Sequence, residues 1–420
     1  MYRILALFLG FGYIQVSSQI PEELPQILST DAGKKISDVD TWENRRKPEI
    51  LDLFRDEVYG WFPADFKPEV SFEKVSTDYH ALNGEGIRKQ IIIHVKNPEN
   101  DKQMKIPLLI YLPSGEIRDI PVFLGLNFYG NHTIHADPGI MISDSWVRNN
   151  VDFQIEGFRA DERSRGVRNH RWPVEYILSR GYGLATMYYG DIDPDYDDDF
   201  QNGLHNLFRE DGPYPEDGAG SIAAWAYGLS LAMDYMETDT QIDENKIAVL
   251  GHSRLGKTAL WAGARDTRFA MVISNNSGCG GAALSLRKQG ETVQIINDRF
   301  PHWFNDNFIF YNENETELPV DQHMLLATIA PRFLYVTSAE KDGWADPYGE
   351  QLSTYLAGKV WEKIYNQQVY VPREPRPVNY PVKRGYVGYH IRSGKHDITP
   401  YDWEQFLDFA DLKFRKKSGD

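Results

Sequence analysis

Residues 246–265, KIAVLGHSRLGKTALWAGAR, contain the transition that decides the fold. An apolar run ends in Gly-His-Ser-Arg, and helix-forming residues follow without an intervening loop. This order predicts a buried strand over 246–252, a sharp turn and then a helix. A serine at such a turn is exposed to an approaching substrate, and Gly251 lets the turn close tightly. We therefore predict that Ser253 is a catalytic nucleophile.

Short apolar runs bounded by turn residues predict the strands of a sheet. There are eight of them, at 88–97, 105–113, 120–128, 182–189, 246–252, 271–276, 332–338 and 386–393. The first three follow one another closely, as antiparallel strands joined by short turns do. The later five are separated by longer connections such as the helical segment 220–237, which indicates parallel strands with crossover helices. The predicted fold class is α/β, an α/β-hydrolase fold built as a three-layer αβα sandwich with a mostly parallel central sheet.

The residues around Ser253 meet the usual G-x-S-x-G motif of a nucleophile elbow in part. Leu255 stands where the second glycine is expected, and Gly256 follows one position later. A serine that caps the following helix is the alternative interpretation. Ser253 follows the fifth predicted strand, where this fold places its nucleophile, and this position favours the catalytic interpretation.

The N-terminus has the features of a secretory signal peptide over residues 1–18. Arg3 precedes an apolar stretch from Ile4 to Ile14, and the small residues of Val16-Ser17-Ser18 suit cleavage before Gln19. The apolar stretch is too short for a membrane span. These features predict a secreted or periplasmic protein, and a buried N-terminal strand is the alternative.

The rest of the chain shows no repeat and no Pro/Ser-rich linker. Apolar residues recur at helical spacing between about 40 and 59, which predicts a helix before the first strand. We therefore expect an N-terminal extension at 19–85 that packs on the core, and one catalytic domain at 86–420.

Charge and composition narrow the choice of partners. The formal net charge is −16, which disfavours nucleic acid and anionic membranes as partners. Cys279 is the single cysteine, so no internal disulfide can form. The acidic run at 190–200 does not match a calcium loop and is interpreted as a solvated loop. His132 and His135 lack a third clustered ligand, so we expect neither a metal nor a cofactor.

Arg254 directly follows the predicted nucleophile. In a nucleophile elbow the backbone N–H of this residue helps to form the oxyanion hole, and the new helix adds its positive end. An arginine here can also direct its guanidinium at the developing negative charge. We predict that Arg254 stabilises the oxyanion, with a second N–H from near Phe128 after the third predicted strand.

His396 is the predicted general base for Ser253. A serine needs a histidine within hydrogen-bond reach, and in this fold the histidine lies in the loop after the eighth strand. His396 lies in that loop, whereas His390 lies inside the predicted strand. His252 is adjacent to Ser253 and is expected to point away from it.

Three segments carry a family resemblance. GHSRLGKTALWAGA at 251–264, FPHWFNDNF at 300–308 and DGWADP at 342–347 resemble carbohydrate esterase family 15, the glucuronoyl esterases. The resemblance implies a metal-independent serine esterase that cleaves esters between glucuronic-acid groups of xylan and alcohols of lignin. It also implies that Arg254 is the oxyanion residue.

The same resemblance implies three substrate contacts. Lys257 matches a position that binds sugar hydroxyls, and Glu291 and Trp344 match further contacts to the uronate. Without the family, Lys257 and Glu291 are interpreted as ordinary exposed charges, and Trp344 fits packing and stacking equally well.

The acid that orients His396 departs from the family pattern. Many members carry a glutamate after the sixth strand, where this chain has Asn276, which cannot stabilise an imidazolium by charge. The segment after the seventh strand supplies Glu340, Asp342 and Asp346 instead. Asp342 is the predicted acid, because it lies a few residues past the strand end, whereas Asp346 precedes a proline and suits a turn.

The predicted protein is a serine carboxylesterase that hydrolyses 4-O-methyl-glucuronoyl esters, the lignin–xylan linkages, through an acyl-enzyme. Its expected partner is glucuronoxylan or a lignin–carbohydrate ester. Two alternatives stay open at this point. An acetyl-xylan esterase shares the chemistry, and a non-catalytic glycan-binding relative is compatible with Asn276.

Overall fold

The computed structural model describes residues 21, 23–30, 33–64, 66–115, 118–210 and 212–415. The signal peptide predicted at 1–18, with its cleavage before Gln19, lies outside the described residues. None of the helices in these ranges combines the length and the apolar character that crossing a membrane requires.

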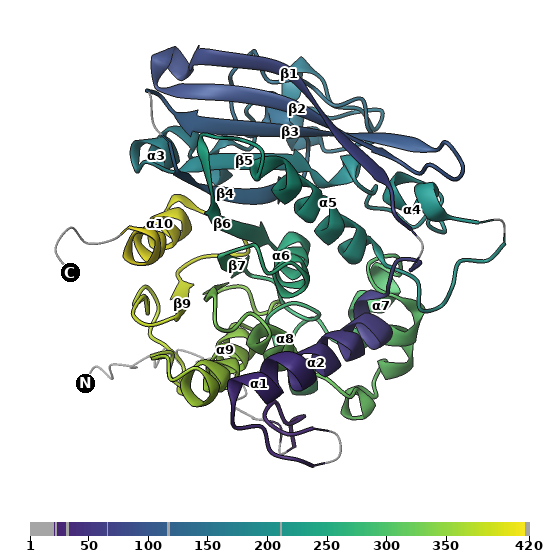
Figure 1. The fold of residues 1–420 in the computed structure, drawn as a ribbon, viewed down its shortest axis with the longest axis vertical. Helices are drawn as coiled ribbons and strands as arrows, with labels where there is room; N and C mark the ends of the chain where they lie inside the picture. The colour runs from purple at the N-terminus through teal and green to yellow at the C-terminus, as the bar shows by residue number, and fades with distance from the viewer. Residues whose placement is uncertain are drawn as a thin grey trace, which may run out of the picture.

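The described residues form a nine-stranded sheet with the order β1-β2-β3-β5-β4-β6-β7-β8-β9 (Figure 1). The strands are β1 (Glu69–Ala81), β2 (Gly86–Lys96), β3 (Gln103–Pro113), β4 (Ile120–Asn127), β5 (Gly183–Tyr188), β6 (Ile242–His252), β7 (Met271–Asn275), β8 (Phe333–Ala339) and β9 (Val387–Arg392). The neighbouring strands β5, β4, β6, β7, β8 and β9 are all parallel to one another. The pairs β1–β2, β2–β3 and β3–β5 are antiparallel. The mostly parallel sheet with helices on both faces confirms the predicted α/β-hydrolase class.

Two features of the sheet differ from the sequence-based prediction. The third predicted strand, β4, runs antiparallel to its predecessor but does not pair with it: β4 lies between β5 and β6 and is parallel to both, while β3 pairs with β5. Every residue of β4 except Pro121 is buried, which suits a central strand. The edge strand β1 was not predicted, because it is largely exposed and its polar sequence carries little apolar periodicity.

Helices cover both faces of the sheet. They are α1 (Val39–Thr41), α2 (Lys47–Phe54), α3 (Val174–Ser179), α4 (Gly203–Phe208), α5 (Ser221–Met236), α6 (Arg254–Arg265), α7 (Val293–Arg299), α8 (Gln322–Ala327), α9 (Pro347–Ile364) and α10 (Pro400–Phe414). π-Helical turns on either side of α2 extend it to 42–59, and α5 occupies the second predicted helix. The helix α2 contacts α8, and Figure 1 shows α1 and α2 on the side of the molecule where α8 and α9 lie.

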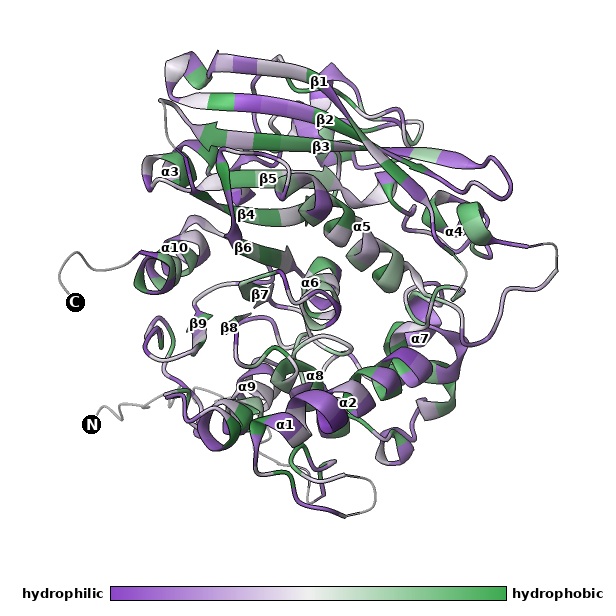
Figure 2. Ribbon diagram, in the orientation of Figure 1, coloured by the Kyte–Doolittle hydropathy of each residue, from purple (hydrophilic) through white to green (hydrophobic). Residues whose placement is uncertain are grey.

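The core has two layers, one on each face of the sheet. In β6, Ile247 and Val249 contact the layer that holds α5, α6, α8 and α9. Ala248 and Leu250, which alternate with them, belong to the layer that holds α3 and α10. This period of two is what burial on both faces requires, and Figure 2 shows the resulting apolar character of the central strands.

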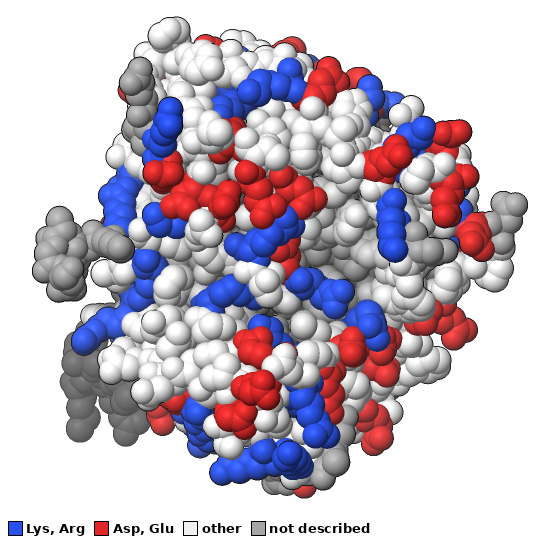
Figure 3. Space-filling model, in the orientation of Figure 1, with Lys and Arg blue, Asp and Glu red and all other residues white. Residues whose placement is uncertain are grey.

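Charged side chains are interspersed on the face seen in Figure 3. A row of Asp and Glu lies above a group of Lys and Arg near the middle of the view. The surplus of acidic residues in the sequence, 61 against 45 basic ones, is therefore not gathered into one patch on this face.

The turn between β6 and α6 forces Ser253 into a strained backbone conformation. Its φ and ψ are 60° and −130°, a region that residues with a side chain rarely occupy. The Ser253 side chain makes no capping hydrogen bond to α6, contrary to the capping alternative. A Cβ at residue 251 would overlap the backbone carbonyl of Leu255, so this tight turn requires glycine.

We expect Gly251→Ala to lower stability by about 3 kcal/mol or more, because backbone on both sides of the turn would have to separate. Thermal unfolding of the variant measures this loss. Gly343→Ala is the matched control, since a Cβ there meets no atom within 4 Å. An unfolding temperature of Gly251→Ala equal to that of the control would show that the turn tolerates a side chain.

Candidate active site

A cavity of about 300 Å³ opens where β6, β7, β8 and β9 end. All seven site residues predicted from the sequence line it: Ser253, Arg254, Lys257, Glu291, Asp342, Trp344 and His396. Asn276 and Trp303 line it as well. The carboxyl ends of parallel strands meet at one edge of the sheet, which is why loops far apart in sequence converge here.

His396 and Asp342 form a hydrogen-bonded pair inside this cavity. His396 Nδ1 lies 2.6 Å from Asp342 Oδ2, and the imidazole side chain is 38% exposed while the carboxyl is buried. Burial raises the pKa of Asp342, but the hydrogen bond and charge of His396 outweigh it, so the pKa lies below its usual value. The carboxylate is therefore ionised and fixes the Nδ1–H tautomer, which leaves Nε2 as the proton acceptor.

The other two histidines near the turn have different surroundings. His390 lies in the core, where its ring nitrogens contact Asp402 at 2.9 Å and the Tyr335 hydroxyl at 3.0 Å. His252 is buried, with its ring centroid 4.6 Å from that of His396 and its Nδ1 2.6 Å from Asn275 Oδ1. Burial and the neighbouring Arg171 and His396 hold the pKa of His252 well below its usual value, so this ring is neutral.

Asn276 takes part in the site as a hydrogen-bond donor. Its Nδ2 donates to Asp342 Oδ2 at 2.9 Å, so the residue that departs from the family pattern contacts the predicted acid, which lies in the loop after the neighbouring strand β8. Its backbone has φ of 49°, and the next two N–H groups, of Ser277 and Gly278, donate to Glu350. Burial raises the pKa of Glu350 to about 8, and this carboxyl holds the loop after β7 in place.

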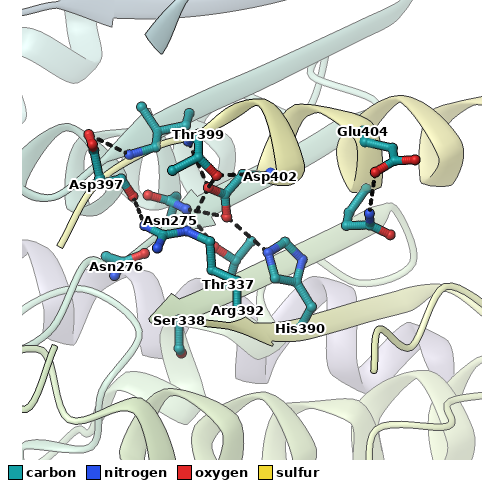
Figure 4. A network of polar contacts seen from close by, with 12 residues as sticks. Asn275, Asn276, Thr337, Ser338, His390, Arg392, Asp397, Thr399, Asp402 and Glu404 are labelled. Atoms are coloured by element: carbon teal, nitrogen blue, oxygen red, sulfur yellow. Dashed lines mark hydrogen bonds and ion pairs between the residues drawn. The ribbon is translucent and has the colours of Figure 1, made fainter. Parts of the chain in front are cut away.

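A buried network holds the loop that carries His396 (Figure 4). The Arg392 guanidinium donates to the carbonyls of Lys395 at 2.9 Å and Asp397 at 2.6 Å, on either side of His396. It also pairs with Asp402, whose Oδ2 lies 2.8 Å from Arg392 Nε. Burial raises the pKa of Asp402, but contacts with His390 and Arg392 outweigh it and keep the carboxyl ionised.

Arg254 is held by a carboxylate that the sequence analysis had assigned to solvent. Its guanidinium forms an ion pair with Asp195 and lies 4.5 Å from the centre of the Trp303 ring. Asp195 is buried, and it also accepts hydrogen bonds from Tyr189, His302, Trp303 and Arg148. Burial raises the pKa of Asp195, but the charge of Arg254 outweighs it and the pKa is strongly lowered.

The interpretation of 190–200 as a solvated loop was wrong for its first half. Asp191, Asp193 and Asp195 are buried, and Asp193 accepts from Ser221 at 2.6 Å and contacts His205 at 2.7 Å. The partners of these carboxylates come from distant segments, so the local sequence gave no sign of their burial.

The three predicted substrate contacts form one connected group. Lys257 Nζ donates to the Ser277 carbonyl at 2.6 Å and to Glu291 at 3.1 Å, and Trp344 Nε1 donates to the other Glu291 oxygen at 3.1 Å. Lys257 and Glu291 are buried, contrary to the interpretation without the family, and Trp344 is 42% exposed. Arg299, which the sequence analysis missed, lines the cavity 5.3 Å from the Trp344 ring.

No group of three or more His, Cys, Asp or Glu side chains in the described ranges is arranged to hold a metal ion. Phe128, near which a second oxyanion donor was predicted, has its ring 5.8 Å from the Arg254 guanidinium. The donor role of its backbone stays a prediction.

We expect Arg392→Lys to lower kcat on an ester substrate about 100-fold with little change in KM. Lysine keeps a charge beside Asp402 but cannot bridge both carbonyls that fix the His396 loop, and small misplacements of a catalytic group cost about this much. Steady-state kinetics and the unfolding temperature are measured for the variant and for Arg384→Lys, an exposed control. Wild-type kcat in Arg392→Lys would mean that the loop needs no such support.

Comparisons with known proteins find related esterases. A family model described as glucuronyl esterase of fungi matches residues 205–365. A carbohydrate esterase from an unknown prokaryotic organism is 49% identical over 405 residues, which cover 96% of this chain and 92% of that protein. A 4-O-methyl-glucuronoyl methylesterase of Podospora anserina is 36% identical over 162 residues, or 35% of this chain and 32% of that protein.

Solved structures show the same relationship. A glucuronoyl esterase from Solibacter usitatus superposes with a TM-score of 0.85 at 44% identity, over 93% of this chain and 97% of that one. An esterase of carbohydrate esterase family 15 from a marine bacterial metagenome, described as promiscuous, gives a TM-score of 0.85 at 48% identity, over 93% and 96%. Because these similarities span nearly the whole chain, the protein belongs to carbohydrate esterase family 15, a family of carboxylic ester hydrolases.

Proposed function

We propose that the protein hydrolyses 4-O-methyl-glucuronoyl esters, including the lignin–xylan linkage, through a serine acyl-enzyme. The observation that carries this proposal is the hydrogen-bonded pair of His396 and Asp342, which lines the same cavity as Ser253. Ser253, Asp342 and His396 follow one another along the chain in the order nucleophile, acid, base that is typical of this fold. Membership of the family supports the substrate class.

Proton transfer begins with His396. Its Nε2 takes the proton of the Ser253 hydroxyl as the oxygen attacks the ester carbonyl, and Asp342 stabilises the imidazolium that forms. The imidazolium then gives this proton to the departing alcohol. In the second half, His396 activates a water molecule, which attacks the acyl-enzyme and releases the uronate.

Arg254 and backbone N–H groups at the start of α6 stabilise the negative charge that develops on the carbonyl oxygen. Asp195 and the Trp303 ring fix the guanidinium before substrate arrives, so the donors need no reorganisation during the reaction. Because Asp195 balances the buried positive charge, the arginine acts here through directed hydrogen bonds.

Lys257, Glu291 and Trp344 bind the uronoyl group. The ion pair of Lys257 with Glu291 presents polar atoms to sugar hydroxyls, and the exposed Trp344 ring offers a face for the sugar. Binding energy from these contacts holds the ester carbonyl against Ser253.

The location and domain organisation belong to the same proposal. The signal peptide predicted at 1–18 would export the protein to where glucuronoxylan occurs. The boundary between an extension at 19–85 and a catalytic domain at 86–420 stays a prediction, although β1 lies within 19–85 and pairs with β2 along the sheet.

The proposal is tested by hydrolysis of a methyl ester of 4-O-methyl-glucuronic acid. Wild type is expected to hydrolyse it, and Ser253→Ala to lose activity by about 10⁶-fold, as for other lost serine nucleophiles. A serine-reactive phosphonate should label wild type and leave the variant unlabelled.

Two results would contradict the proposal. A strong preference for acetylated xylan over the glucuronate ester would assign the protein to the acetyl-xylan esterases. Absence of both labelling and hydrolysis would favour the non-catalytic glycan-binding alternative.

A further inference from the structure

A second and larger cavity, of about 530 Å³, lies outside the catalytic site. Its walls come from the segment that follows α2, from the β2–β3 turn at 97–100 and from the segment between α4 and α5. In Figure 1, α4 lies at the end of the β2–β3 hairpin, and the described residues place it in contact with β3. The volume is within the range of small-molecule binding sites.

Aromatic rings form one side of this cavity. Trp61 is 39% exposed, so part of its side chain is accessible to a ligand. Phe66 and Phe208 lie behind the surface with their ring centroids 5.0 Å apart, and Tyr214 is fixed by a hydrogen bond of 3.0 Å to the Ala219 carbonyl. Rigid, partly exposed rings of this kind suit the apolar faces of sugar rings.

Polar groups form the other side. Glu99, Asn100 and Glu210 are exposed around the cavity and offer carboxylate and amide groups to hydroxyls. The Arg209 Nη1 atom is buried and has no hydrogen-bond partner among the described residues, although Nη2 pairs with Asp199 at 2.7 Å. The exposed carboxylates and the amide favour a ligand that carries hydroxyl groups.

The charge of the cavity suits the neutral main chain of a glucuronoxylan better than its anionic uronate branches. Three carboxylates, of Glu99, Glu210 and Asp217, line it, against one guanidinium, of Arg209. This balance disfavours an anionic uronate branch. A neutral sugar chain meets no such repulsion.

The cavity lies close to the catalytic site. Gly218 lines it, and three residues later Ser221 N donates to the His302 carbonyl at 2.8 Å. The next residue, Trp303, lines the catalytic cavity and holds Asp195. The walls of the two cavities are therefore joined where segment 218–221 contacts residues 302–303.

We infer that the second cavity binds the neutral, β-linked main chain of xylan while the catalytic cavity holds its esterified branch. The inference rests on the proposed function for the identity of the polymer. Binding at two linked sites raises the effective concentration of the ester at Ser253, so polymeric substrates gain where small esters do not.

Calorimetric titration of the protein with unbranched xylohexaose, which carries neither ester nor charge, tests the inference independently of catalysis. Trp61→Ala is expected to weaken binding about tenfold, because it removes the stacking face. It should raise KM on a xylan-linked glucuronoyl ester by a similar factor and leave the small methyl ester unchanged. Tyr79→Ala, an exposed aromatic residue on β1, is the matched control.

A second variant protects the test against a folding defect in Trp61→Ala. Glu210→Ala changes an exposed side chain with no hydrogen-bond partner among the described residues, and it should also weaken xylohexaose binding. Wild-type affinity in both variants, or tighter binding of cellohexaose than of xylohexaose, would overturn the inference. Failure to hydrolyse the small ester would instead refute the proposed function and leave the binding result standing.

Discussion

The hydrogen bond between His396 Nδ1 and Asp342 Oδ2 is 2.6 Å long, and the rest of the site holds these two residues in the positions that the bond requires. The two residues follow neighbouring parallel strands, β9 and β8, so the register of the sheet brings them together. Hydrogen-bond donors from neighbouring residues then hold Asp342 and His396 in place. Asn276 donates to Asp342, and Arg392 binds the carbonyls on either side of His396. In the proposed mechanism, a histidine base aligned in this way needs no acid at position 276.

Paired charges explain how so polar a site exists in a cavity with buried walls. Arg254, which is largely buried, is paired with Asp195, and the buried Lys257 is paired with Glu291, so neither cation is left uncompensated. Arg299 is exposed, lies over Trp344 and has no carboxylate within ion-pair distance among the described residues. The cavity therefore keeps one exposed cation beside Trp344, the residue proposed to contact the uronate.

Much of the fold and the site could be predicted because the signals are local. Buried strands such as β6 show their apolar runs directly, and Ser253, Asp342 and His396 each follow a strand end. Structural features that depend on partners distant in the sequence could not be predicted in this way. The lateral position of β4 depends on which strands lie beside it, and the burial of Asp195 depends on Arg254, which is remote in sequence.

Asp342→Asn tests the central claim, that this carboxylate is the acid of the triad, most directly. Asparagine keeps the size of the side chain but removes the charge that stabilises the imidazolium, so kcat should fall about 10⁴-fold in a variant that is still folded at the assay temperature. Glu340→Gln, a neutralised carboxylate in the same loop, should retain wild-type kcat. Near-wild-type turnover in Asp342→Asn would contradict the account.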